Sequence, residues 1–383
     1  MAYDVISADG HIDLIWLPPD LFTSQASGQM KDRMPFVVDG EKGPKWISKN
    51  GGEFGLMNGM GSAGREYVPG QIARSDRMAE TGLYDDGKKG IRRLTDPELR
   101  IKDQDRDGVR GEVLYGILGA SQRLNDPEAA AEMMTIYNDW LADFCDAAPH
   151  RFAGIAPLPN KNVPAAVAEI ERVAKRGAVK GIEIANSHDM LPLYHPDWDP
   201  LWAAANEAKL PVHVHTIGTP KIDTTGFAPL QQRQAFAVQL TGFQMGMSRV
   251  LMEVIYGGIL EKYTDVKLVI GESGIGWIPY VLEHMDLEWE EQFKDLTLTM
   301  KPSEYWHRQC RATYQSDNVG LKLIDELGED NVIVMWGSEL PHLVGVWPDL
   351  QVFVDREVGY LPETTRRKVI CENAAKLYGF PLQ

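Results

Sequence analysis

The sequence predicts an α/β fold in which eight parallel strands close into a barrel. Strand-length apolar runs alternate with longer helical patterns along most of the 383 residues, which is typical of a parallel sheet covered by helices. The runs are rich in Val and Ile without strict alternation, as expected for strands buried on both faces. They span 3–11, 111–118, 152–159, 179–185, 211–217, 266–273 and 331–339, and a weaker run near 311–315 would supply the eighth strand.

Helices are expected between these strands, at 126–149, 162–178, 198–209 and 317–330. The first has Asp126 as its expected N-cap and Pro127 at its first helical position, both favoured at helix starts. Gly177 and Gly328 are the expected ends of the second and fourth helices. The chain is therefore expected to form one barrel domain over 1–383.

Residues 17–95 do not follow the alternation and are predicted to be a long insertion after the first strand. An insertion there lies at the C-terminal face of a barrel, where barrels place their chemistry. Its segment 50–70 is rich in glycine, methionine and aromatic residues. We expect a lid or pocket wall, and Trp16, Trp46, Phe54 and Tyr67 favour ordered packing over a disordered surface loop.

Charge excludes some partners. A net charge of −16 argues against sequence-independent binding to nucleic acid, which needs a basic surface. It argues equally against an anionic membrane surface. The nearest basic cluster, "KKGIRR" at 88–93, is interpreted as an ordinary solvated loop.

Three widely spaced cysteines, Cys145, Cys310 and Cys371, form neither a disulfide framework nor a zinc knuckle. The first residues enter a strand-like run without a basic region or an apolar signal core. No apolar stretch approaches the roughly 18 residues of a membrane helix. We expect a cytoplasmic protein.

Residues of the types that bind metal ions lie at the ends of four predicted strands. Asp9 and His11 are two apart, a spacing that directs both side chains to one face of a strand, and His213 and His215 repeat it. Glu272 and Glu339 each end a further strand. Because such ends converge in a barrel, these residues predict a site for zinc, manganese or another first-row divalent ion.

Each of these residues also has a simpler explanation. Asp9 could cap the turn after its strand, Glu272 could cap the next helix, and either histidine could be hydrogen-bonded in the core. A shared site is favoured because the simpler account needs a coincidence on four separate strands.

The sequence resembles the amidohydrolase-related branch of the amidohydrolase superfamily over nearly its whole length. The motifs that carry the resemblance are "VISADGHID", "DPELRIKDQDRDGVRGEVLY", "HPDWDPLWAAANEAKLPVHVH", "GESGIGWIPYVLEHMD", "GSELPHLVGVWP" and "ENAAKLYGF". The resemblance implies a distorted (β/α)8 TIM barrel with one divalent ion, zinc as the first expectation, at its C-terminal mouth.

The resemblance also implies roles for individual residues. The ligands fall on Asp9, His11, His215 and Glu339, which leaves His213 as a pocket neighbour. Because Glu339 is one methylene longer than the usual aspartate, it would either coordinate with a different geometry or act as a base instead. Glu272 stands where the family often has a water-activating histidine, and Glu339 stands where it usually has aspartate. The expected catalytic residues are Glu272 and Glu339, and the expected substrate-binding residues are His213, Trp277 and His342.

Three activities remain open from the sequence. Hydrolysis of a small ester, amide, lactone or ring-cleavage diketone by metal-activated water is the first expectation. Non-oxidative decarboxylation of a small aromatic or enoic acid is the alternative, which Asp9 favours. A barrel that has lost its metal and only binds a small molecule is the third.

A homodimer is also expected. Members of the resembled family are commonly homodimers, and Trp16, Trp46, Trp306 and Trp347 are candidate interface anchors. The competing explanation is that these tryptophans line the pocket or fold under the lid.

Overall fold

The computed structural model describes residues 3–186, 190–215, 223–328 and 333–382. The chain divides into two compact units, Met1–Ile184 with Met335–Gln383, and Ala185–Val334. The larger sheet has eight strands in the order β1-β5-β6-β7-β8-β9-β10-β11. Its strands are β1 (Val5–His11), β5 (Val109–Tyr115), β6 (Phe152–Pro157), β7 (Val179–Glu183), β8 (Val212–His215), β9 (Leu268–Gly271), β10 (Cys310–Tyr314) and β11 (Val334–Trp336).

The predicted (β/α)8 barrel is confirmed. The chain order of the strands is also their order in the sheet, and the pairs β1·β5, β5·β6, β6·β7, β8·β9 and β9·β10 are parallel. Most strand residues are buried, which explains the continuous apolar runs. The weak run near 311–315 is β10.

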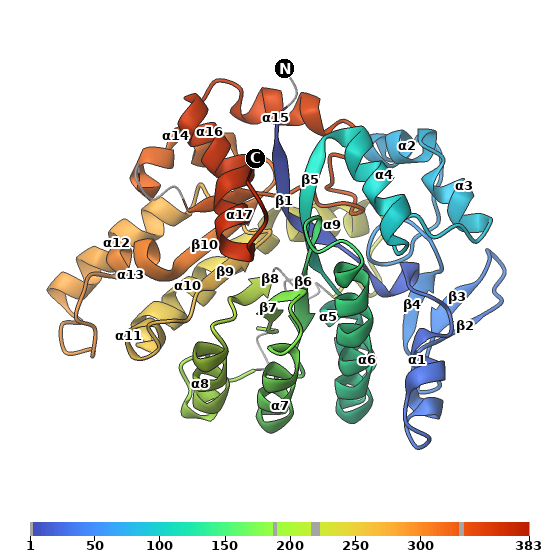
Figure 1. Ribbon diagram of the computed structural model, residues 1–383, viewed down its shortest axis with the longest axis horizontal. Coiled ribbons are helices and arrows are strands. Elements are labelled where there is room, and N and C mark those ends of the chain that lie inside the picture. Colours follow the sequence, from blue (N-terminus) through green and yellow to red (C-terminus); the bar gives the residue numbers. More distant parts are fainter. Residues whose placement is uncertain (1–2, 187–189, 216–222, 329–332, 383) are drawn as a thin grey trace. The chain divides into compact units, whose positions relative to one another are not determined.

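In the first unit the strands alternate with α4 (Pro97–Asp107), α5 (Leu118–Arg123), α6 (Pro127–Asp146) and α7 (Val163–Val173) (Figure 1). The Asp126 side chain accepts from the Ala129 backbone N–H at 3.2 Å, and Pro127 follows it, so the predicted start of α6 is confirmed. The expected end of the next helix at Gly177 is wrong, because α7 stops at Val173.

The second unit contains α8 (Asp199–Ala208), α9 (Pro229–Gly242), α10 (Met247–Tyr256), α11 (Ile259–Lys262), α12 (Ile278–Glu291), α13 (Pro302–Gln309) and α14 (Asn318–Lys322). The expected helix over 317–330 is wrong. α14 and a short 3-10 turn at Ile324–Leu327 occupy its described part. Residues 329 and 330 of this expected helix lie outside the described residues. So do residues 216 and 217 of one expected strand and residues 331 and 332 of another.

The insertion at 17–95 is folded. It contains an antiparallel sheet of β2 (Phe36–Val38), β3 (Lys45–Ile47) and β4 (Glu53–Leu56), together with α1 (Leu21–Gln25), α2 (Ala73–Glu80) and α3 (Leu83–Lys88). Trp46 and Phe54 are buried. The expectation of ordered packing is confirmed for this segment.

The insertion contacts the chain that follows β11. The Arg74 guanidinium donates to the backbone carbonyl of Val344, and the Arg77 guanidinium pairs with the Asp349 carboxylate at 2.6 Å. A side chain at Gly61 would lie 3.2 Å from the Leu343 side chain. The insertion is thus anchored to the segment that also carries Glu339 and His342.

The C-terminal helices α15 (Leu350–Val358), α16 (Glu363–Arg367) and α17 (Asn373–Tyr378) complete the first unit. No helix within the described ranges is long and apolar enough to cross a membrane.

The tryptophans expected to anchor a dimer are buried inside the single chain. Trp46 and Trp306 are 0% exposed, and Trp16 and Trp347 are 2% exposed. Using them as interface anchors was wrong, because packing within the chain already covers them. The homodimer itself stays a prediction.

Candidate metal centre

The end of β1 is held by the chain that follows β11. The Glu339 backbone N–H donates to the Asp9 carbonyl at 2.9 Å, and the His11 N–H donates to the Leu340 carbonyl at 2.8 Å. A Cβ at Gly337 would lie 2.4 Å from the Asp9 Cβ. Only glycine permits this approach, so the first strand and the last are fixed at the point where their ligand-type side chains project.

A buried ion pair supports the same end of β1. Arg100 of α4 and Glu112 of β5 make a bidentate pair at 2.7 and 2.8 Å, and both side chains are almost fully buried. Arg100 Nη1 also donates to the His11 carbonyl at 3.2 Å. Two-point pairing of this kind fixes geometry, so Arg100 positions the backbone of a candidate ligand.

Two carboxylates converge on His11. Its Nε2 lies 3.3 Å from Asp9 Oδ1 and 3.1 Å from Glu339 Oε2. Burial acts to lower the pKa of His11, but hydrogen bonds and charge from Asp9 and Glu339 outweigh it and raise that pKa well above its usual value. Two buried carboxylates thus create a strong preference for positive charge at this position.

The predicted set of four ligands comes together. Asp9, His11, His215 and Glu339 each offer a ligand atom, these atoms lie within 4.8 Å of one another, and all four residues are buried. Two imidazole nitrogens and two carboxylate groups form a donor set that suits zinc, manganese and other first-row divalent ions. The residues therefore fit the one-metal site predicted from the sequence.

The two histidines of β8 differ in their relation to the candidate ligand group. His213 and His215 are both buried, but only His215 belongs to the metal-ligand group found among the described residues. The role of His213 as a substrate-binding neighbour stays a prediction.

Glu272 follows β9 in a left-handed backbone conformation, with φ of 48°. Its N–H donates to Thr313 Oγ1 of β10 at 2.7 Å, and its Oε2 lies 3.9 Å from His215 Nδ1. Its side chain is 11% exposed. A carboxylate thus stands beside a candidate ligand without belonging to the group of four.

Trp277 ends the loop that carries Glu272. Its indole N–H donates to the Ser273 carbonyl at 2.9 Å, and the Asp317 carboxylate accepts the Ile275 and Gly276 N–H groups, each at 2.7 Å. Trp277 is only part-buried. Its predicted contact with substrate stays a prediction.

His342 lies within the cluster of the first unit. Its ring stacks on that of His11, with centroids 3.8 Å apart, and its Nε2 lies 3.1 Å from Asp13 Oδ2. Burial acts to raise the pKa of Asp13, but the charge and hydrogen bond of His342 outweigh it, and the pKa lies below its usual value. Asp13 was missed in the sequence, although "DGHID" places it two residues after His11.

Arg123 was also missed. It ends α5, and its guanidinium lies 5.6 Å from the centroid of the Phe54 ring in the insertion. Burial lowers the pKa of Arg123, and the negative charge of Asp13 opposes that shift. A cation therefore stands near Asp13, between the barrel strands and the insertion of the first unit. Nothing in the "SQRLND" sequence around it indicated this position.

This fold and this ligand group define a metal-binding protein of the (β/α)8 barrel class, with its candidate centre at the carboxyl ends of the strands. The chain belongs to the amidohydrolase family: the family model described as Amidohydrolase matches residues 88–380. The resemblance seen in the sequence is confirmed.

The individual relatives share only a modest fraction of identical residues with this chain. The chain is 22% identical over 291 residues to 2-amino-3-carboxymuconate-6-semialdehyde decarboxylase of Dictyostelium discoideum, covering 74% of this chain and 77% of the relative. It is similar to the crystal structure of an amidohydrolase from Mycobacterium avium subsp. paratuberculosis K-10, with a TM-score of 0.72 and 19% identity over 100% and 99% of the two chains.

A third similarity concerns a structure that holds a metal. Dihydroxybenzoic acid decarboxylase from Polaromonas sp. JS666, with bound manganese and the inhibitor 2-nitroresorcinol, matches with a TM-score of 0.62 and 20% identity, covering 82% of this chain and 95% of that one. Further curated relatives are gamma-resorcylate decarboxylases.

These comparisons correct the activity expected from the sequence. The sequence favours hydrolysis for two reasons: Glu272 stands where the decarboxylases commonly have a histidine, and the predicted mouth offers few basic partners for a substrate carboxylate. The curated relatives, however, are decarboxylases. The replacement of one proton-carrying side chain by another does not by itself favour water as the nucleophile. The first expectation of a hydrolase is therefore wrong.

Proposed function

We propose that the protein is a metal-dependent, non-oxidative decarboxylase of small aromatic carboxylic acids. The observation that carries the proposal is the buried group of Asp9, His11, His215 and Glu339. The relatives that are named decarboxylases support the choice of reaction.

Asp9, His11, His215 and Glu339 would hold the metal. A divalent ion there supplies positive charge that attracts the substrate carboxylate and an adjacent hydroxyl. We propose manganese or zinc. The donor set suits both ions, and manganese is the ion named with one relative's structure.

The reaction exchanges a carboxylate for a proton. The bond between the ring carbon and the carboxylate breaks, its electron pair stays on the ring carbon, and carbon dioxide leaves. A proton must then reach that carbon. Glu272 is the proposed donor because its carboxylate lies beside His215 at 3.9 Å and keeps some exposure to solvent, from which it can be reprotonated.

Arg123 is proposed to attract the substrate anion. The sequence indicated His213 and His342 as substrate-binding residues, and a histidine carries no permanent positive charge. The Arg123 guanidinium lies at the Phe54 ring and within the field of Asp13, so it adds a permanent cation. An aromatic acid could use both the ring and the charge.

The test is carbon dioxide release from a panel of hydroxybenzoates. The protein is stripped with a chelator, reloaded with manganese or zinc, and assayed with the same panel and with aryl esters. We expect one carbon dioxide per substrate consumed, dependence on the metal, and no reaction of Asp9→Asn. Ester turnover without carbon dioxide release would overturn the proposal.

A further inference from the structure

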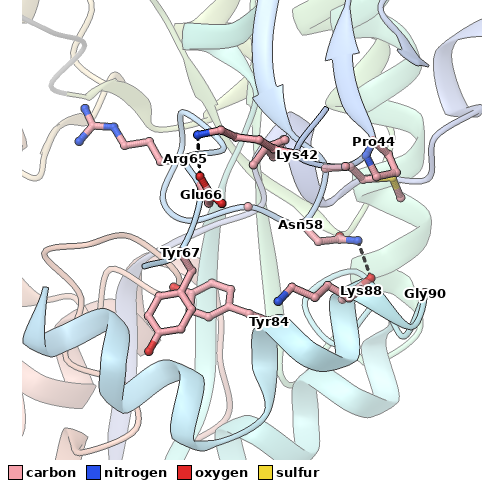
Figure 2. Close-up of a pocket in the computed structure, with 14 residues that line it drawn as sticks. Lys42, Pro44, Asn58, Arg65, Glu66, Tyr67, Tyr84, Lys88 and Gly90 are labelled. Atoms are coloured by element: carbon pink, nitrogen blue, oxygen red, sulfur yellow. Dashed lines mark hydrogen bonds and ion pairs between the residues drawn. The ribbon is translucent and has the colours of Figure 1, made fainter. Parts of the chain in front are cut away.

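The insertion contains a pocket of its own, of about 490 Å³. Figure 2 shows it between the chain before β3, the chain after β4, and helix α3. All of its lining residues lie between Lys42 and Gly90, so none of them is a candidate metal ligand or a proposed catalytic residue. Its volume is in the range of ordinary small-molecule sites.

One wall of the pocket is aromatic. The Tyr67 and Tyr84 rings stack with centroids 4.9 Å apart and an interplanar angle of 21°. Their hydroxyl groups are engaged elsewhere, that of Tyr67 with Asp76 at 2.8 Å and that of Tyr84 with the Met78 sulfur at 3.8 Å. The hydrogen bond to Asp76 raises the pKa of Tyr67, and burial raises that of Tyr84 to about 12. The rings thus stay neutral. Tyr67, which is part-buried, offers most of the aromatic surface to a flat apolar group, and the buried Tyr84 ring supports it from behind.

The charge around the pocket is mainly positive. Lys42, Arg65 and Lys88 line it against one carboxylate, Glu66. Lys42 is paired with Glu66 at 2.8 Å. Figure 2 shows the Arg65 guanidinium directed away from the other labelled side chains, whereas Lys88 extends toward the tyrosines. Lys88 is therefore the cation best placed to meet a ligand.

Lys88 is not tightly paired. Its ammonium nitrogen lies 3.7 Å from Asp85 Oδ1, longer than a hydrogen bond, and its side chain is 76% exposed. Lys88 is the first residue of "KKGIRR", which the sequence suggested to be an ordinary solvated loop. In the structure it is the last residue of α3 and lines a cavity.

The floor of the pocket is fixed by close packing. Asn58 adopts a left-handed conformation with φ of 54°, its N–H donates to the Ile15 carbonyl, and its Nδ2 donates to the Gly87 carbonyl at 3.0 Å. A Cβ at Gly87 would lie 2.8 Å from the Asn58 Cβ. Backbone held in this way does not need a ligand to take its shape.

We propose that this pocket is a second binding site, for a small planar organic carboxylate. The flat part of the ligand would lie against Tyr67 and Tyr84, and its carboxylate would pair with Lys88. Because no pocket residue belongs to the metal centre, the inference does not depend on the proposed reaction. It is a binding site without chemistry, since the pocket contains no group placed to act on the ligand.

Benzoate is the probe, titrated into chelator-treated full-length protein and followed by saturation-transfer NMR. We expect saturable binding that persists in Arg123→Gln, so that it is separate from any binding at the candidate active site. Benzamide, the neutral isostere of benzoate, should bind at least several-fold more weakly. Lys88→Gln should weaken benzoate binding about tenfold, the loss of one charge-assisted contact. Lys89→Gln is the matched control, because Lys89 is the next lysine but does not line the pocket, and it should stay within about twofold.

Three results would overturn the proposal. The first is equal binding by wild type and Lys88→Gln, and the second is equal binding of benzoate and benzamide. The third is loss of binding in His11→Ala, which would assign the signal to the metal centre. Because Lys88 is exposed, its replacement does not threaten the fold, and failure of the decarboxylase assay would leave this test unaffected.

Discussion

Glu272 and Glu339 occupy similar backbone positions but different surroundings. Each follows a barrel strand, each stands where the resembled family usually has another residue, and each is left-handed, with φ of 48° and 57°. Glu339 is fully buried, lies 3.1 Å from His11 Nε2, and is fixed through its N–H to Asp9. Glu272 is partly exposed and is fixed through its N–H to a threonine hydroxyl.

The difference separates a ligand from a proton carrier. A buried carboxylate is stable only with a cation or strong donors around it, which matches the place of Glu339 among the candidate ligands. A carboxylate with access to water can exchange protons between turnovers, which matches Glu272. Non-glycine residues in the left-handed conformation cost free energy and are often found at functional sites. Substitution of Glu272 or Glu339 is therefore expected to impair function.

The largest expected effect is on metal binding. Glu339→Gln removes a charged ligand and should weaken metal affinity by more than about hundredfold. Glu339→Asp, which keeps the charge and the residue type usual in the family, should retain metal. Elemental analysis after dialysis measures both variants. A full metal content in Glu339→Gln would break the comparison, because Glu339 would then not be a ligand.

The second effect is on turnover without metal loss. Glu272→Gln keeps the shape of the side chain but cannot carry a proton, so we expect a fall in kcat of about 10²- to 10⁴-fold. The metal content of the same preparation should equal that of wild type. A loss of metal as large as in Glu339→Gln would make the two glutamates equivalent and contradict their separation.

The third effect concerns substrate capture. Arg123→Gln should raise KM about tenfold, while kcat and metal content stay near wild type, since the lost contact is made equally in ground and transition states. Arg92→Gln is the control, because Arg92 is exposed and lies in the connection between α3 and α4. An unchanged KM with a reduced kcat would show that Arg123 acts on the reaction rather than on binding.

The smallest expected effect is on the pH dependence of stability, and it concerns Asp107, a buried carboxylate outside the candidate ligand group. Burial raises the pKa of Asp107 to about 7, whereas the unfolded value is about 3.9. The folded chain then holds a proton that the unfolded chain releases, so stability is highest below about pH 4 for this group and falls as the pH rises toward 7.

Asp107→Asn mimics the protonated acid and should remove that loss. Wild type should lose a few degrees of Tm more than Asp107→Asn between pH 5 and 7.5, measured by thermal scanning in matched buffers. An equal fall in Tm in both proteins would show that ionisation of Asp107 does not destabilise the folded chain.

The barrel could be predicted because its strands are buried on both faces and therefore appear as continuous apolar runs. The ligands could be predicted because Asp9, His11, His215 and Glu339 each end such a run. Asp13 and Arg123 could not, since their roles depend on contacts with His342 and Phe54, which are far away in the sequence. The Arg100–Glu112 pair could not either: the two residues are only 12 apart, but their burial together depends on how α4 packs on β5. The short strands and α3 of the insertion are too short to show a periodic pattern of apolar residues. The pocket that they form was therefore not predicted.

The most direct test of the central claim is decarboxylation in D₂O by the manganese-loaded protein, using an aromatic acid that it consumes. The account predicts one carbon dioxide and one deuterium on the ring carbon that lost the carboxylate, for each substrate. It also predicts that Glu272→Gln, at full metal content, loses both together. Carbon dioxide release and deuterium incorporation that continue at the wild-type rate in Glu272→Gln would contradict the account, because the proton would then come from another group.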